Sequence, residues 1–279
     1  MMSDKSLGDR MKEYEAVTTS GTLTRRVPVI IRLDGRAFHT FSRRMERPYD
    51  EVFHQCMCWT SLELCKKVQG SKFAFHFSDE ISILLTDYDT LDTEPYFGYC
   101  LQKVVSVTAS LCTARFADAC LQRGVPWARP VQQFDCRAFN VPRDDIANYF
   151  LFRQRDCTRN SIQSCAQTVY SHKQLHGADS SKMQDMLMEK GINWNKMPTR
   201  FKRGIAVYKP MVDWFADYET PIFSKYREFV EMWTLPEEER EKLEDRERPG
   251  WGEEYKDARA LGFVDDKPEG GHAQNQERR

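Results

Sequence analysis

Two apolar segments separated by only two polar residues constrain the fold of this chain more than any other feature. Lys72–Phe77 carries phenylalanine at every second position, and Glu80–Thr86 is almost continuously apolar. Ser78 and Asp79 alone lie between them, which leaves room only for a tight turn. The two segments therefore form an antiparallel hairpin, and the rest of the fold has to cover its faces.

The hairpin lies within an ordered series of strand and helix patterns. Val27–Arg32 predicts a buried strand, and Val131–Val141 predicts the last strand of the series. Asp50–Val68 and Phe97–Leu121 carry apolar residues at steps of three and four, which is typical of amphipathic helices. The order β-α-β-β-α-β is that of a ferredoxin-like α+β sheet.

After Pro142 the patterns become mainly helical, with one or two helices over 144–170, a short helix over 180–190 and a strand near 205. We expect three parts. Residues 1–142 form the sheet domain, residues 143–235 form a helical, basic part, and residues 236–279 form a charged tail that is peripheral or disordered.

Composition narrows the class of protein. Of the 279 residues, 41% are hydrophobic and 30% are charged, which is typical of a globular chain. No apolar run approaches the ~18 residues of a membrane span, and the charged N-terminus does not resemble a secretory signal. The nine cysteines lie mostly within apolar patterns and lack zinc-site spacing. We therefore expect reduced thiols, a cytoplasmic location and no membrane partner.

Charge is distributed unevenly. Residues 151–210 contain 11 Lys and Arg against 4 Asp and Glu, a net charge of +7, whereas residues 237–279 carry a net charge of −5. A basic block in an otherwise neutral chain predicts a polyanionic partner such as nucleic acid. The alternative is a solvated basic helix face.

Two carboxylates are expected to meet at one edge of the sheet. Asp34 ends the first strand, and Asp79 lies in the hairpin turn next to it. Carboxylates a few Å apart repel unless a cation lies between them, and carboxylates with phosphate oxygens are ligands that Mg²⁺ prefers. Two such ions ~4 Å apart can stabilise an in-line displacement at phosphorus. The alternative is that Asp-Gly and Ser-Asp are two ordinary turns.

The residues after Asp34 suit a triphosphate. Gly35 lets the backbone approach a metal or phosphate closely, and the amides of Arg36, Ala37 and Phe38 follow at a predicted helix start. Nearby arginines, including Arg47, add positive charge.

These stretches resemble the motifs of a known family. RLDGRAFHTF and FAFHFSDEISIL, followed in order by short matches at 134–137, 153–157 and 202–204, are similar to the tRNA-His guanylyltransferase superfamily. Members of that superfamily extend RNA in the 3′-to-5′ direction on a polymerase-like palm. The resemblance covers about residues 5 to 210 and implies a palm domain, tRNA and nucleoside triphosphates as partners, ATP and GTP as substrates, and a homotetramer.

The resemblance also implies roles for single residues. Asp34 and Asp79 would be the catalytic carboxylates that hold two Mg²⁺ ions, together with the carbonyl of Gly35. Residues implied to bind the nucleotide are Arg32, Gly35, Arg36, Ala37, Phe38, Arg47, Asp50 and Ser78. Residues implied to bind RNA are Arg153, Arg159, Asn160, Lys202 and Arg203.

One departure from the family bears on the substrate. Eukaryotic members carry His-Ile-Asn-Asn where this chain has Thr158–Ser161 (TRNS), a sequence closer to the bacterial and archaeal branch. Members of that branch resemble repair enzymes that add template-complementary nucleotides to 5′-truncated tRNAs. We therefore expect tRNA 5′-end repair. The alternatives are a true tRNA-His guanylyltransferase that adds the −1 guanosine, a palm-type nucleotide cyclase, and a non-catalytic RNA-binding protein.

Overall fold

The structure is a computed structural model that describes residues 6–9, 11–12, 14, 21–125, 131–210 and 212–244. Residues up to Arg240 form one compact unit, and Glu241–Arg279, of which the first four residues are described, form a second. The principal elements are β1 (Val29–Gly35), α2 (Phe38–Phe41), α3 (Glu51–Lys67), β2 (Ser71–Phe77), β3 (Glu80–Leu85), α4 (Leu101–Gln122), β4 (Phe134–Asn140), α5 (Ile146–Ala166), α6 (His172–Leu175), α7 (Ser180–Glu189), α8 (Thr199–Arg203), β5 (Ile205–Tyr208), β6 (Phe215–Asp217), α9 (Glu228–Glu231) and α10 (Glu237–Glu244).

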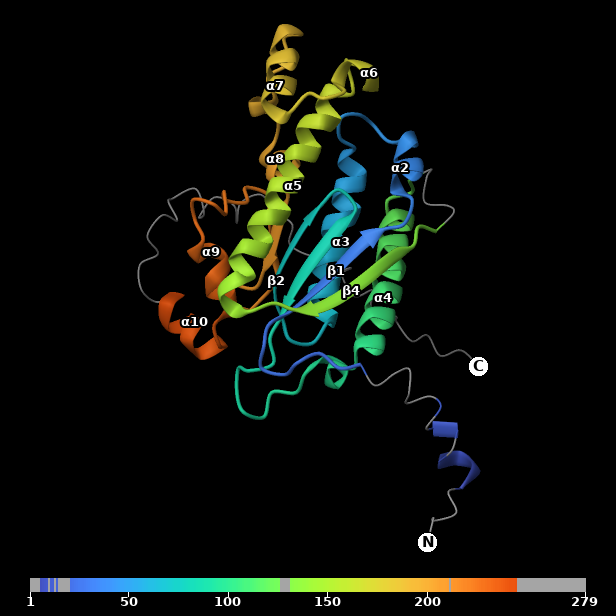
Figure 1. The fold of residues 1–279 in the computed structure, drawn as a ribbon, viewed down its shortest axis with the longest axis vertical. Coiled ribbons are helices and arrows are strands. Elements are labelled where there is room, and N and C mark those ends of the chain that lie inside the picture. Colours follow the sequence, from blue (N-terminus) through green and yellow to red (C-terminus); the bar gives the residue numbers. More distant parts are fainter. Residues whose placement is uncertain are drawn as a thin grey trace, which may run out of the picture. The chain divides into compact units, whose positions relative to one another are not determined.

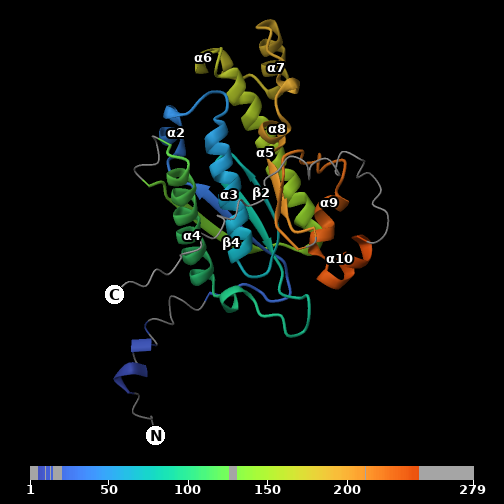
Figure 2. The same cartoon turned by 180° about the vertical axis from the view of Figure 1, so that it is seen from behind.

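The first unit is built on one antiparallel sheet with the strand order β4-β1-β3-β2-β5-β6. Its first four strands and the helices α3 and α4 confirm the predicted split βαβ arrangement. Figure 1 shows α5 crossing in front of the sheet, and Figure 2, from behind, shows α3 and α4 on the other face. One face of the sheet is therefore covered by α3 and α4, and the other face is covered in part by α5.

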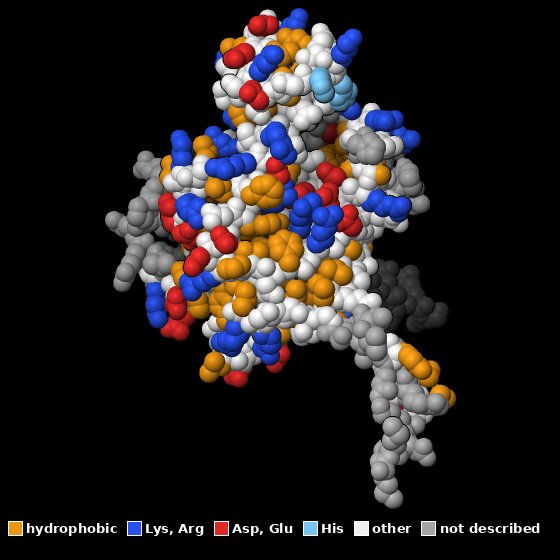
Figure 3. Space-filling model, viewed as in Figure 1, with side chains coloured by type: hydrophobic (Ala, Val, Ile, Leu, Met, Phe, Trp, Pro, Cys, Tyr) orange, Lys and Arg blue, Asp and Glu red, His pale blue; other side chains and the backbone are white. Residues whose placement is uncertain are grey.

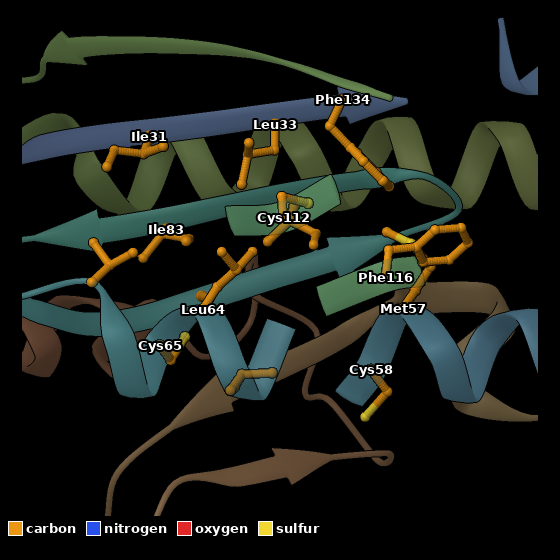
Figure 4. Close-up of a cluster of buried hydrophobic side chains, with 14 of the residues drawn as sticks. Ile31, Leu33, Met57, Cys58, Leu64, Cys65, Ile83, Cys112, Phe116 and Phe134 are labelled. Carbon is orange, nitrogen blue, oxygen red and sulfur yellow. The ribbon is translucent and has the colours of Figure 1, made fainter. Parts of the chain in front are cut away.

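Strand alternation divides the side chains between these two faces. Ile31, Leu33 and Ile83 point toward α3 and α4, where they meet Leu64 and Phe116 in the main core (Figure 4). The residues between them, such as Arg32 and Asp34, therefore face the α5 side. Near the middle of the sheet this second face is also apolar, with the ring of Phe73 4.8 Å from that of Phe150 in α5.

The part of the chain after residue 142 completes the sheet. β5 pairs with β2, and β6 pairs with β5, so the predicted strand near 205 is confirmed and the first two predicted parts share one sheet. The functional division into three parts stays a prediction. The tail contains α10, and its residues after 244 lie outside the described part of the chain.

Element boundaries differ from the sequence prediction in two informative places. β1 continues through Asp34 and Gly35, because both residues pair with β4. α4 begins at Leu101, whereas the prediction began it at Phe97, because Phe97 and Gly98 have φ of 52° and 59°.

α4 is long and apolar enough to cross a membrane by length and composition alone, yet one stripe of it is buried in the core. None of the nine cysteines, all of which lie in the described part of the chain, forms a disulfide.

Gly204, between α8 and β5, occupies a backbone position that excludes a side chain. Its φ is +75°, and a Cβ would lie 2.5 Å from the ring of Phe75 and 2.8 Å from the carbonyl oxygen of His76. Gly191 has the same φ of +75°, but a Cβ there would meet nothing within 4 Å. Gly204 therefore has both a steric overlap and, with ψ of −174°, a backbone conformation that is nearly restricted to glycine, whereas a Cβ at Gly191 meets no neighbour.

We predict that Gly204→Ala lowers the free energy of unfolding by about 3 kcal/mol or more, since the strain of this glycine-specific backbone conformation and overpacking add. Gly191→Ala should cost only about 1 kcal/mol, from the strain alone. Urea unfolding of both variants measures the difference, and equal losses would show that the contact with β2 is unimportant.

A pair of buried histidines lies between α3 and β2. The rings of His54 and His76 are 5.7 Å apart. Among the described residues, no hydrogen-bond partner is present for either ring nitrogen of His76 or for the Nε2 atom of His54. Burial lowers the pKa of His54 to about 4, and burial together with His54 lowers the pKa of His76 far below its usual range. Both rings are therefore neutral in the folded protein at pH 7.

Because the unfolded chain binds these protons below pH ~6.5 and the folded protein does not, stability should fall as the pH is lowered from 7 to 5. The expected loss is up to ~2 kcal/mol per histidine. The carboxyls of Asp79 and Asp217, with pKa values raised to about 6, and of Glu80, with a pKa raised to about 7, act in the opposite direction. Urea unfolding at both pH values should therefore compare wild type with His76→Leu, in which this part of the pH dependence disappears. An identical dependence in both proteins would contradict the assignment.

Candidate active site

The antiparallel register places three acidic residues side by side. Asp34 in β1 lies directly opposite Glu80 in β3 and directly opposite Asp135 in β4. Directly opposed residues on neighbouring strands point to the same face of a sheet. Asp79, the residue before Glu80, lies in the hairpin turn at the same edge. The sheet thus gathers four carboxylates around the end of β1.

The hairpin turn brings Asp79 close to Asp34. Ser78 takes a left-handed conformation with φ of 49°, and its hydroxyl donates a hydrogen bond to Asp79 Oδ1 at 3.0 Å. Burial, and after it the negative charge of Asp34, raises the pKa of Asp79 to about 6. The predicted meeting of these two carboxylates at one sheet edge is therefore present in the structure.

Two arginines balance this negative charge. Arg32 Nη2 lies 2.9 Å from Asp34 Oδ2, and its Nε lies 3.3 Å from Glu80 Oε2. Arg153 from α5 approaches the other oxygen of Glu80 at 3.3 Å and is also paired with Asp156. Burial raises the pKa of Glu80 to about 7, although both arginines oppose that rise.

The residues at this edge fit a hard cation. After burial, the negative charge of Asp34 is the next cause of the raised pKa of Asp79, and a cation between the two carboxylates would relieve that unfavourable interaction. Among the described residues, no three His, Cys, Asp or Glu side chains are arranged as a complete metal site. Mg²⁺ suits such a partial shell, because it commonly takes one or two carboxylates and fills the rest with water and substrate phosphates.

The turn from Gly35 to Phe38 differs from the triphosphate-binding turn that the sequence predicted. A Cβ at Gly35 would lie 2.2 Å from the ring of Phe38, so glycine is required here by the core packing of Phe38. The amide of Arg36 donates to the carbonyl of Gln133 at 2.9 Å and is not free for a phosphate, which corrects that part of the prediction. Ala37 is exposed and left-handed, with φ of 57°.

Asp50 and Arg47 precede α3. Asp50 caps this helix: its Oδ1 accepts from the amide of Phe53 at 2.8 Å, and its Oδ2 accepts from the amide of Glu46 at 3.1 Å. Both carboxylate oxygens therefore have a structural role, whereas the sequence analysis predicted that Asp50 binds the nucleotide. Arg47 is exposed, which leaves its predicted contact with a triphosphate open.

The residues predicted to bind RNA fall into two groups. Arg159 and Asn160 are exposed on α5, whereas Arg153 is only 6% exposed and is held by two carboxylates. Arg153 thus belongs to the carboxylate cluster and is not a surface contact for RNA. Lys202 donates to the carbonyl of Asn195 at 2.6 Å, and it and Arg203 are half-buried.

Sequence reasoning missed Asp135 and Asp156 as members of this cluster. Asp156 joins buried Arg153 to exposed Arg159, whose Nη2 lies 2.8 Å from Asp156 Oδ1. The i,i+3 spacings 153–156 and 156–159 were a usable signal for these pairs. Asp135 required the β1–β4 register, which no local pattern reveals.

A split βαβ sheet with opposed carboxylates at the end of its first strand and in its hairpin defines a palm-type nucleotidyltransferase. The family model for tRNAHis guanylyltransferase matches residues 8–142. A bacterial tRNA(His) guanylyltransferase-like protein, solved in complex with ATP, is 43% identical, with 83% of this chain and 100% of that chain covered and a TM-score of 0.79. The chain belongs to the tRNA(His) guanylyltransferase superfamily, whose members are nucleotidyltransferases that act on tRNA.

Two further structures are similar. A bacterial tRNA(His) guanylyltransferase-like protein in complex with GTP is 39% identical over 83% of this chain and 100% of that chain, with a TM-score of 0.73. The tRNA(His) guanylyltransferase of Saccharomyces cerevisiae is 25% identical over 67% of this chain and 88% of that chain, with a TM-score of 0.59. The family membership excludes neither repair nor −1 addition.

We predict that Asp34→Ala and Asp79→Ala each reduce nucleotide addition by more than about 100-fold, the loss expected when a group that stabilises transition-state charge is removed. Asp79→Ala should not lower the melting temperature, because it relieves a repulsion. Asp118→Ala, a surface change on α4, is the control and should leave addition unchanged. Single-turnover addition and thermal melting measure both properties, and wild-type rates in either variant would refute the role of that carboxylate.

Proposed function

We propose that this protein is a Mg²⁺-dependent 3′-to-5′ nucleotidyltransferase that repairs the 5′ ends of truncated tRNAs. The observation that supports this chemistry is the proximity of Asp34, at the end of β1, to Asp79 in the neighbouring hairpin turn, at one edge of the palm sheet. These two side chains, with the carbonyl of Gly35, would hold two Mg²⁺ ions. When bound, the ions would neutralise charge on the reacting phosphates.

The chain's own residues would bind and orient the reactants. Arg32 and exposed Arg47 offer positive charge for a triphosphate, and Arg32 is held in place by Asp34 and Glu80. The 3′-hydroxyl of the incoming nucleotide attacks the 5′ phosphorus of the RNA and gives up its proton as the new P–O bond forms. From a 5′-triphosphate, pyrophosphate leaves; a 5′-monophosphate is first adenylylated by ATP, which releases pyrophosphate, and AMP then leaves in the attack. No side chain needs to act as a nucleophile, so catalysis rests on positioning and charge.

ATP and GTP are the proposed substrates, with GTP or another template-complementary nucleotide added to the RNA. This choice is supported by the bacterial relatives, which were solved in complex with ATP and with GTP. A homotetramer and a cytoplasmic location stay predictions from the resemblance and the composition.

The preference for repair over −1 addition is supported by the segment Thr158–Ser161. Ser161 and Thr158 are held internally: Ser161 Oγ accepts from the indole of Trp194 at 3.1 Å, and the Thr158 hydroxyl donates to the carbonyl of Lys202 at 3.1 Å. Arg159 and Asn160 are left exposed on α5. An arginine there can contact any phosphate of an RNA end, and a contact of that kind does not select one tRNA.

The decisive experiment compares two RNA substrates at equal concentration, with Mg²⁺, ATP and all four nucleoside triphosphates. One is a tRNA that lacks its first nucleotide, and the other is intact tRNA-His with its unpaired −1 position. A repair enzyme should extend the truncated tRNA with the higher kcat/KM. It should also change the added nucleotide when the opposing base is changed, because base pairing selects that nucleotide.

A higher kcat/KM for intact tRNA-His, with guanosine added whatever the opposing base, would overturn the repair assignment in favour of the true tRNA-His guanylyltransferase. A matched variant, Arg159→Gln, should weaken binding of both RNAs equally, since it removes a phosphate contact.

A further inference from the structure

An exposed aromatic ring lies next to the carboxylate cluster. Phe152 on α5 is 54% exposed, although it is followed by the buried Arg153. The guanidinium carbon of Arg153 lies 4.4 Å from the centre of the Phe152 ring. Because Arg153 is fixed by Glu80 and Asp156, the ring rests on a rigid, charged support. Phe152 is therefore presented to solvent in an ordered position.

The support of this ring reaches the reacting edge of the sheet. Arg153 Nε lies 3.3 Å from Glu80, and its guanidinium carbon lies 5.9 Å from the ring centre of Phe77, the residue that precedes the Ser78–Asp79 turn. Figure 3 shows exposed hydrophobic side chains over α5 beside a group of acidic and basic side chains near the end of β1. A ligand that contacts Phe152 would thus lie beside the candidate active site.

Two arginines continue the same face of α5 away from that site. Phe152, Arg155 and Arg159 follow at steps of three and four residues, so their side chains are neighbours on the helix surface. Arg155 and Arg159 are exposed and line a cleft of about 260 Å³, together with Thr158 and Ser180. The distance along the helix from position 152 to position 159 is about 10 Å, at 1.5 Å per residue.

We propose that Phe152 is a stacking platform for the terminal base of the RNA substrate, with the adjoining phosphates on Arg155 and Arg159. This inference rests on the proposed function and identifies how the same site would hold the end of its RNA. Bases that leave a helix end commonly stack on aromatic rings, and backbone phosphates follow a line of arginines. Phe152 is here a positioning residue for the RNA end and takes no part in the chemistry.

The geometry favours an RNA strand over a free nucleotide. The ring and the two exposed arginines lie in a row along about 10 Å of α5, an arrangement that suits one stacked base followed by backbone phosphates. An apolar protein partner would not match a face with two exposed arginines.

The test uses the full chain and an acceptor-stem hairpin RNA that lacks its first nucleotide and carries 2-aminopurine as its last paired base. Stacking on Phe152 should quench the 2-aminopurine fluorescence. Phe152→Leu keeps the apolar volume but removes the aromatic face, and it should abolish the quench and weaken RNA binding about 5- to 100-fold. The loss should be similar at low and high salt, since stacking releases no counterions.

Phe152→Trp is the conservative variant and should keep both the quench and the affinity. Phe97→Leu is the matched control, because Phe97 is also exposed, at 43%, but lies before α4. Thermal melting should be unchanged in all three variants. An unchanged quench in Phe152→Leu, or a wild-type complex without a quench, would overturn the stacking role.

Two further outcomes separate this inference from the proposed function. If free 2-aminopurine riboside triphosphate is quenched in a Phe152-dependent manner and the RNA is not, the ring serves the incoming nucleotide and the inference is wrong. If the RNA end is quenched by Phe152 but no nucleotide is added to it under any tested condition, the stacking platform stands and the proposed function is wrong.

Discussion

The repulsion between Asp34 and Asp79, and the way in which the fold tolerates it, is the constraint on which the rest of this structure depends. An antiparallel sheet that places Asp34 opposite both Glu80 and Asp135 would gain more from apolar residues at these positions. The chain accepts the unfavourable arrangement because Arg32 lies between Asp34 and Glu80 and offsets part of the negative charge. A stability cost at one edge of an otherwise apolar sheet is typical of a functional site.

Helix α5 is bound to this edge by charge as well as by packing. Its apolar side contacts β2 through Phe150, and its buried Arg153 reaches Glu80. The other side of Arg153 leads through Asp156 to the exposed Arg159. One helix therefore carries a buried face that orders the carboxylates and a solvent-facing stripe that suits an RNA backbone. This double use explains why a polar patch interrupts the apolar stripe of α5.

Much of the fold was predictable because it depends on local patterns. The hairpin followed from a two-residue gap, and the helices α3 and α5 followed from the three- and four-residue spacing of their apolar residues. The predicted start of α4 was wrong because no sequence signal distinguishes the left-handed Phe97 from a helical residue. The structural roles of Gly35 and Asp50 were also hidden. One depends on the ring of Phe38, and the other depends on the amides of Phe53 and Glu46.

The sequence by itself determined that β2 and β3 form a hairpin, which faces of the elements are apolar and, through the β-α-β-β-α-β order, that Asp34 and Asp79 end at one edge of the sheet. These properties depend on the periodicity of apolar residues and on short connections, both of which are local features of the sequence. Only the tertiary structure decided that Asp135 joins them, that Arg153 is buried while Phe152 and Arg159 are exposed, and that Arg36 gives its amide to Gln133. Those outcomes depend on strand register and on which side of a helix meets the sheet. Both are set by contacts between residues far apart in sequence.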